Sequence, residues 1–94
     1  MAVQISDQAD QSRYEAHEGG ELAGVAAYER GDGVVTFTRT VVPDAYSGQG
    51  VGSALARTAL DDARAQGLSV VPRCSFIAAW IERHPEYADL VATD

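Results

Sequence analysis

The segment Ser47-Gly48-Gln49-Gly50-Val51-Gly52-Ser53 contains three glycines and joins a run of β-branched residues to a helical pattern. Because glycine lacks a side chain, backbone N–H groups in such a loop can approach an anion closely, and the N-terminus of the following helix adds positive potential. The residue types and their spacing therefore favour binding of a phosphate or diphosphate group. A flexible turn with no ligand is the alternative for the same composition.

Two well-known nucleotide sites do not fit this segment. A P-loop needs Gly-Lys followed by Ser or Thr, whereas Gly52 is followed by Ser53 and Ala54, so the cation and the metal ligand are missing. A dinucleotide fingerprint starting at Gly48 would have Ser53 in place of its third glycine, and the predicted strand 68–72 contains no acidic residue. The sequence weakens both alternatives.

Cys74 is the most distinctive candidate nucleophile. It follows a short apolar run and Arg73, and it lies at or beside the start of a predicted helix. A helix N-terminus and a neighbouring cation both stabilise a thiolate, and a thiolate can carry an acyl group. The alternative is a small buried apolar side chain, which is the usual role of a free cysteine.

His84 is a candidate general base, because imidazole exchanges its proton near neutral pH. Its position directly before Pro85 also suits a cap at the end of a helix. We assign Trp80 to packing and His17 to the surface of a strand.

The first half of the chain predicts a sheet. Residues 13–17 and 22–28 form two strands around Gly19-Gly20, a pair suited to positive φ. After a second glycine turn, residues 34–42 are dense in β-branched residues, and Pro43 ends this strand because proline has no N–H for the ladder. Residues 1–11 are polar without a period, which predicts a loose N-terminal arm before a single domain at 12–94.

The second half predicts a helix, a strand and a second helix. Apolar residues recur at helical spacing from Val51 to Ala63, Gly67 suits the helix stop, and residues 68–72 suit a buried strand. Ser75 is a candidate cap for the second helix, which should end before Pro85. Arg57 and Asp61 are spaced to pair on the first helix.

Composition limits the partners. The net charge of −7 and the presence of only seven basic residues, all arginine, disfavour nucleic acid as a partner. No stretch approaches the roughly 20 apolar residues of a membrane span. The single cysteine cannot form an internal disulfide and the N-terminus lacks signal-peptide features, so we expect a cytoplasmic protein, monomeric or a small homo-oligomer, that holds no metal.

The motifs resemble those of the GCN5-related N-acetyltransferases. The family signature is Arg or Gln, two residues, Gly, one residue, and Gly or Ala. Gly50 and Gly52 occupy the two small positions, whereas Ser47 stands at the Arg or Gln position. Pro-Arg-Cys-Ser-Phe at 72–76 and His-Pro-Glu-Tyr at 84–87 are similar to a small, truncated subfamily, and the resemblance covers residues 14–91.

The resemblance implies an α/β (α+β) fold: a mostly antiparallel sheet of three strands, a crossover helix, a fourth strand splayed from the third, and a C-terminal helix. Acetyl-CoA would lie in the gap between the splayed strands, where Val41 and Val42 offer backbone groups. The predicted contacts to its diphosphate come from the glycine loop: Ser47, Gly48, Gln49, Gly50, Val51, Gly52 and Ser53.

The resemblance also bears on catalysis. Tyr87 is similar to a subfamily tyrosine that could protonate the departing CoA thiolate, although Leu90 and Val91 at helical spacing favour a packing role. The subfamily often reads His-Thr-Glu-Val where this chain has Arg39-Thr40-Val41-Val42, so the expected acidic base is missing.

Three functions follow from these observations. The preferred one is acetyl transfer from acetyl-CoA to an amine of unknown identity, either directly or through Cys74. The second is a module that binds acetyl-CoA or CoA without turnover, and the third is an interaction protein whose glycine loop is only structural.

Overall fold

The computed structural model describes residues 3–92, which form one five-stranded sheet in the order β1-β2-β3-β4-β5. The strands are β1 (Gln4–Gln8), β2 (Arg13–Glu18), β3 (Glu21–Gly31), β4 (Val34–Val41) and β5 (Ser69–Pro72). The helices are α1 (Val51–Ala65) and α2 (Ser75–Arg83), with short 3-10 segments η1 (Ala9–Gln11), η2 (Asp44–Tyr46) and η3 (Pro85–Leu90). Neighbouring strands are antiparallel except β4 and β5, which are parallel and joined through α1. The predicted mixed fold with a crossover helix and a C-terminal helix is confirmed.

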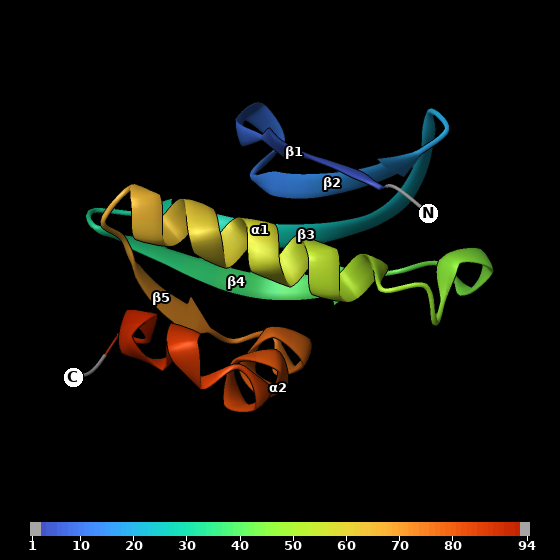
Figure 1. Ribbon diagram of the computed structural model, residues 1–94. Helices are drawn as coiled ribbons and strands as arrows, with labels where there is room; N and C mark the ends of the chain where they lie inside the picture. The colour runs from blue at the N-terminus through green and yellow to red at the C-terminus, as the bar shows by residue number, and fades with distance from the viewer. Residues whose placement is uncertain (1–2, 93–94) are drawn as a thin grey trace.

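One face of the sheet carries α1, and α2 lies beside the β5 edge (Figure 1). The core between them contains large, fully buried side chains from both layers: Phe37, Val51, Leu55, Leu60, Val70, Ile77 and Trp80. Burial of each such side chain stabilises the fold by about 1.5–3 kcal/mol. This core fixes α1 against the sheet, and with it the loop that precedes α1. No helix among residues 3–92 is long and apolar enough to cross a membrane.

The expectation of a loose N-terminal arm is wrong for the part of residues 1–11 that the structure describes. Residues 4–8 form β1, which pairs with β2 in the register Ile5↔Ala16 and Asp7↔Tyr14. The ladder needs only backbone groups, so an edge strand can form from polar residues that show no alternation. Residues 1 and 2 of the predicted arm lie outside the described residues.

Two predicted turns are confirmed. Gly19 and Gly20 have φ of 57° and 84° and connect β2 to β3 across the pair Glu18↔Glu21, which is the two-residue hairpin that their composition favours. Gly67 has a φ of 70° and follows α1, and the next residue donates its N–H to the carbonyl of Ala63 at 2.9 Å. A left-handed glycine of this kind ends many helices.

β4 contains an irregularity that determines where its second half points. Phe37 pairs with Tyr28, but Arg39 pairs with Ala27, so Thr38 is an extra residue without a partner on β3. A bulge of this kind bends the strand. The pairing of β4 with β5 ends at Phe37 and Pro72, next to the bulge, so the two strands separate from Thr38 onward.

Candidate active site

The loop before α1 is held open by two glycines in the left-handed region. Gly48 and Gly50 both have a φ of 80°, which side chains of L-residues disfavour, and Gly50 is the N-cap of α1. A Cβ built on either glycine would meet nothing within 4 Å. The glycines are therefore required for the backbone path of the loop, and the space beside them is free.

The start of α1 has no side-chain cap, because its N-cap residue is Gly50. The first helical hydrogen bond runs from Ala54 N to Gly50 O at 3.0 Å. The N–H groups of Val51, Gly52 and Ser53 donate to no acceptor within residues 3–92. Three parallel donors at the positive end of a fifteen-residue helix form the kind of site that binds phosphate groups.

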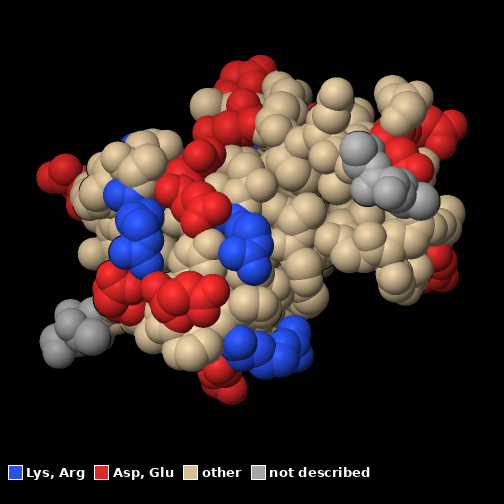
Figure 2. Space-filling view, in the orientation of Figure 1, with Lys and Arg blue, Asp and Glu red and all other residues tan. Residues whose placement is uncertain are grey.

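A cavity of about 330 Å³ opens beside these donors. Its lining comes from β4 and the residue after it, from η2, from the glycine loop, from the first turn of α1 and from α2: Thr40, Val42, Tyr46, Ser47, Gly48, Gly50, Val51, Gly52, Ser53 and Phe76. None of these residues carries a formal charge, and Figure 2 shows few charged side chains where α1 begins. Any anion in the cavity would be held by dipoles and hydrogen bonds rather than by a cation.

The cavity unites most of the predicted cofactor residues. Seven of them line it: Val42, Ser47, Gly48, Gly50, Val51, Gly52 and Ser53. Gln49 does not, because its side chain turns back and donates from Nε2 to the carbonyl of Ala45 at 3.3 Å. Val41 does not line it either, and this residue is 40% exposed. Contact of any of the nine predicted residues with a cofactor stays a prediction.

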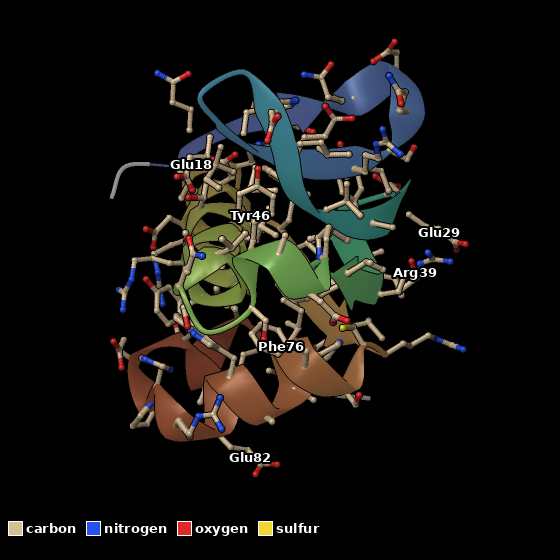
Figure 3. The ribbon with its side chains drawn as sticks, turned by 90° about the vertical axis from the view of Figure 1, so that its right-hand side faces the viewer. Glu18, Glu29, Arg39, Tyr46, Phe76 and Glu82 are labelled. Atoms are coloured by element: carbon tan, nitrogen blue, oxygen red, sulfur yellow. The ribbon has the colours of Figure 1, made fainter. Side chains whose placement is uncertain are left out.

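Three lining residues were missed by the sequence analysis: Thr40, Tyr46 and Phe76. The Tyr46 hydroxyl donates to Glu21 Oε1 at 2.7 Å, which ties the loop to the β2–β3 hairpin and raises the pKa of Tyr46. Phe76 extends from α2 toward the loop that carries Tyr46 (Figure 3). A Cβ at Gly52 would lie 2.7 Å from Phe76 Cζ, so Gly52 is the residue that lets the ring pack against the start of α1.

Cys74 lies at the point where β4 and β5 separate. Its Sγ is 3.3 Å from Thr40 Oγ1, and Thr40 lines the cavity. The cysteine itself is only 6% exposed and does not line the cavity. Its N–H donates to Phe37 O at 2.9 Å, which continues the β4–β5 pairing one step past β5.

The predicted cap of α2 is wrong by one residue. Cys74, with extended φ and ψ of −72° and 121°, is the N-cap, and Ser75 is already helical and caps nothing. The hydrogen bond from Cys74 to Phe37 keeps Cys74 extended, so the helix cannot begin before Ser75. Cys74 therefore does stand at a helix N-terminus, as the sequence predicted.

Tyr87 lies away from the cavity, on the side of α1 that faces η3. Its hydroxyl donates to Asp61 Oδ1 at 2.7 Å and accepts from Arg57 Nη1 at 3.3 Å, and its ring is buried against Trp80. Hydrogen bonding to Asp61 raises the pKa of Tyr87. Arg57 and Asp61, predicted to pair directly, are joined instead through this hydroxyl. These contacts fit the packing alternative, and a catalytic role for Tyr87 stays a prediction.

His84 also lies outside the cavity lining. Its Nδ1 is 2.8 Å from the carbonyl oxygen of Trp80, so this nitrogen carries the proton, and the imidazole stacks on the indole at a centroid distance of 3.7 Å. It is the C-cap residue of α2, as its position before Pro85 suggested. A role as general base stays a prediction that the geometry does not favour.

The sequence of this chain matches a known protein family. A family model described as GCN5-related N-acetyl-transferase matches residues 13–90, a range that includes every residue lining the cavity. The chain belongs to the GCN5-related N-acetyltransferase family. Members of this family generally use acetyl-CoA as the acetyl donor.

Solved structures share the family fold. A GCN5-like protein from Staphylococcus aureus, determined by NMR, superposes with a TM-score of 0.74 at 22% identity and covers 97% of this chain and 89% of its own. Ard1 from Thermoplasma volcanium superposes with a TM-score of 0.58 at 24% identity and covers 65% of this chain. This chain spans only 43% of the Ard1 chain. No curated protein matches the sequence.

Proposed function

We propose that this GCN5-related N-acetyltransferase binds acetyl-CoA in the cavity beside α1 and transfers its acetyl group to an amine. The observation that carries the proposal is the cavity itself, which connects the uncapped start of α1 to Thr40, 3.3 Å from the thiol of Cys74. One end offers donors for a diphosphate, and the other offers Thr40, whose hydroxyl contacts the Cys74 thiol. Family membership supports this proposal, because members of the family use acetyl-CoA, which contains both a diphosphate and a thioester.

The residues at the diphosphate end fit the ligand. The N–H groups of Val51, Gly52 and Ser53 have no protein acceptor within residues 3–92, and Gly48 and Gly50 leave open space beside the loop. Ser47 stands where the family signature has Arg or Gln, so a cation that could reach the diphosphate is missing from the lining. We expect the affinity to depend on backbone donors, with the hydroxyls of Ser47 and Ser53 as additional donors.

The residues at the acyl end are arranged around the separation of β4 and β5. From Thr38 onward no strand among residues 3–92 pairs with β4 on its β5 side, so its backbone groups there are free to pair with an extended ligand. The pantetheine arm of acetyl-CoA is such a ligand, and we propose that Val41 and Val42 pair with it. The thioester would then lie toward Thr40 and Cys74.

Two chemical routes are open to these residues. In the first, the amine nitrogen attacks the acetyl carbonyl carbon directly, the bond to the CoA sulfur breaks, and the amine proton ends on the departing thiolate. In the second, Cys74 Sγ forms a bond to the acetyl carbon while CoA leaves with the thiol proton, and the amine then displaces Cys74 and returns a proton to it. In the second route the Thr40 hydroxyl would lie beside the reacting sulfur, since Thr40 Oγ1 is 3.3 Å from Cys74 Sγ.

A second candidate function is binding of acetyl-CoA or CoA without turnover. The cavity lining contains no carboxylate and no imidazole, so no side chain in it can act as a strong base. The similar truncated subfamily has His and Glu on either side of this threonine, whereas this chain has Arg39 and Val41. The lack of a base in the lining agrees with that difference. Transfer without a base would require an acceptor amine that arrives unprotonated.

The two candidates are separated by mass spectrometry and by release of free thiol. We expect acetyl-CoA to raise the melting temperature, and we expect incubation to add one acetyl group that is absent in Cys74→Ala and in Cys74→Ser. If acetyl-CoA binds but neither an adduct nor thiol release over a panel of amines is found, the binding module is the better description. If acetyl-CoA does not bind at concentrations well above micromolar, both candidates are wrong.

A further inference from the structure

Within residues 3–92 the indole of Trp80 makes one hydrogen bond, and this hydrogen bond reaches the cavity. Its indole Nε1 lies 3.2 Å from Ser53 Oγ. Ser53 is the third residue of α1 and lines the cavity, whereas Trp80 is 1% exposed and belongs to α2. The sequence predicted only packing for Trp80, and the proposed function gives no role to this contact between the two helices.

The chemistry of the two groups fixes the direction of the hydrogen bond. An indole N–H can only donate, whereas a hydroxyl has one proton and two lone pairs. Ser53 Oγ must therefore accept from Trp80, which leaves its own proton available for a different partner. Within residues 3–92 this oxygen makes no other hydrogen bond. Because Ser53 lines the cavity, its free hydroxyl proton lies at the cavity wall, next to the N–H donors of the same helix turn.

The indole is held firmly enough to act in this way. Its ring stacks on His84 at 3.7 Å, Arg57 lies over it at 5.3 Å, and the Tyr87 ring packs against it at 5.3 Å. Phe76, one helical turn before Trp80, packs against Gly52. The same face of α2 thus contacts two successive residues of the first turn of α1.

We propose that Trp80 is a positioning residue for the diphosphate of acetyl-CoA, because its N–H orients the Ser53 hydroxyl as a donor toward the cavity. The inference rests on the proposed function. A hydroxyl that pointed a lone pair into the cavity would repel an anion, so its orientation decides whether Ser53 helps or hinders binding. The described residues that line the cavity include no cation, which makes each neutral donor more important.

The first test measures affinity for two ligands by calorimetry: CoA, and pantetheine, which lacks the diphosphate. Ser53→Ala should weaken CoA binding about tenfold, as expected for loss of one hydrogen bond to a charged group. Trp80→Phe keeps an aromatic ring but removes the N–H, and it should weaken CoA binding about threefold. The double variant should bind CoA no more weakly than Ser53→Ala. Pantetheine binding should be unchanged in all three variants, and Ser69→Ala on β5 is the matched control for loss of a serine hydroxyl.

The second test uses the wild-type chain and does not depend on how Trp80→Phe folds. Trp80 is the only tryptophan in the sequence, so its fluorescence reports on this one indole. Titration with CoA should change the emission, titration with pantetheine should not, and Ser53→Ala should reduce the change.

The outcomes separate the inference from the proposed function. If the wild-type chain does not bind CoA, the proposed function fails. Three results would overturn only the positioning role of Trp80 in a chain that binds CoA. They are a wild-type affinity in Trp80→Phe, effects of the two substitutions that multiply in the double variant, and an emission of Trp80 that does not change when CoA binds.

Discussion

The hydroxyl oxygen of Thr40 lies 3.3 Å from the sulfur of Cys74, across the gap where β4 and β5 cease to pair. Thr40 lines the cavity and Cys74 does not, so the hydroxyl links the cavity wall to the thiol. This relationship makes Thr40 the residue through which the reactivity of Cys74 can be tested.

Thr40→Val should slow alkylation of Cys74 by iodoacetamide, because valine has a similar shape but cannot hydrogen-bond to a thiolate. We expect a reduction of about tenfold, equivalent to roughly 1.4 kcal/mol for one hydrogen bond to a charged group, and recovery in Thr40→Ser. The rate of adduct formation by mass spectrometry is the measurement. A wild-type rate in Thr40→Val would show that the contact does not influence the sulfur.

Gly50→Ala should lower both the stability and the affinity for CoA, because a Cβ at a φ of 80° is strained and the loop must move to relieve it. The cost of such strain is about 1–2 kcal/mol. Gly67→Ala is the matched control, since Gly67 has a φ of 70° at the other end of α1. Chemical denaturation should show similar losses for both variants, and calorimetry should show weaker CoA binding for Gly50→Ala alone. Equal CoA affinity in the two variants would contradict the proposed role of the loop.

Gly52→Ala should destabilise the chain by about 1–3 kcal/mol through overpacking, because its Cβ would lie 2.7 Å from Phe76 Cζ. Phe76→Leu has a shorter side chain at this contact, and combining it with Gly52→Ala should recover part of the loss. The measurement is the free energy of unfolding of the two single variants and the double variant. Additive effects would show that the two residues do not contact each other in solution.

Tyr87→Phe should lower the free energy of unfolding by about 1–2 kcal/mol, because it removes the hydrogen bonds to Asp61 and Arg57. CoA affinity and acetyl transfer should stay at wild-type levels, since Tyr87 lies outside the cavity lining. The opposite result, with wild-type stability and lost transfer, would restore the catalytic role that the sequence suggested for this tyrosine.

The tyrosines should make the fold sensitive to alkaline pH. Burial, together with the hydrogen bond to Asp7, raises the pKa of Tyr28 from 10.0 to about 12. Burial, with a hydrogen bond to Asp62, also raises the pKa of Tyr14. The unfolded chain therefore loses these protons first, so their contribution to stability is complete below about pH 10 and is lost as the pH rises toward 12. Denaturation series from pH 9 to 12 should show this fall, and Tyr28→Phe should reduce it.

Most of the architecture could be predicted because it depends on local signals. Gly19-Gly20 encodes its hairpin through positive φ, and the β-branched residues of β4 and the apolar stripe of α1 encode their elements through composition and period. β1 could not be predicted this way. It is held by backbone pairing to β2, and its residue pattern of Gln4 to Gln8 carries no alternation that marks a strand.

The glycine loop was the predictable part of the site, since its function follows from the absence of side chains. Thr40 and Phe76 could not be found, because their places depend on a bulge in β4 and on how closely α2 approaches Gly52. Counted in simple alternation from Phe37, Thr40 falls on the wrong face of the sheet. It faces inward only because Thr38 is left without a partner.

The unpaired Thr38 makes the site sensitive to the length of β4. Removing Thr38 would let β3 and β4 pair without interruption, and every residue of β4 after Phe37 would then point to the opposite face of the sheet. Thr40 would leave the cavity wall, and its contact with Cys74 would be lost. An exchange of one side chain alters the site at one position, whereas loss of this one residue would invert the whole end of the strand.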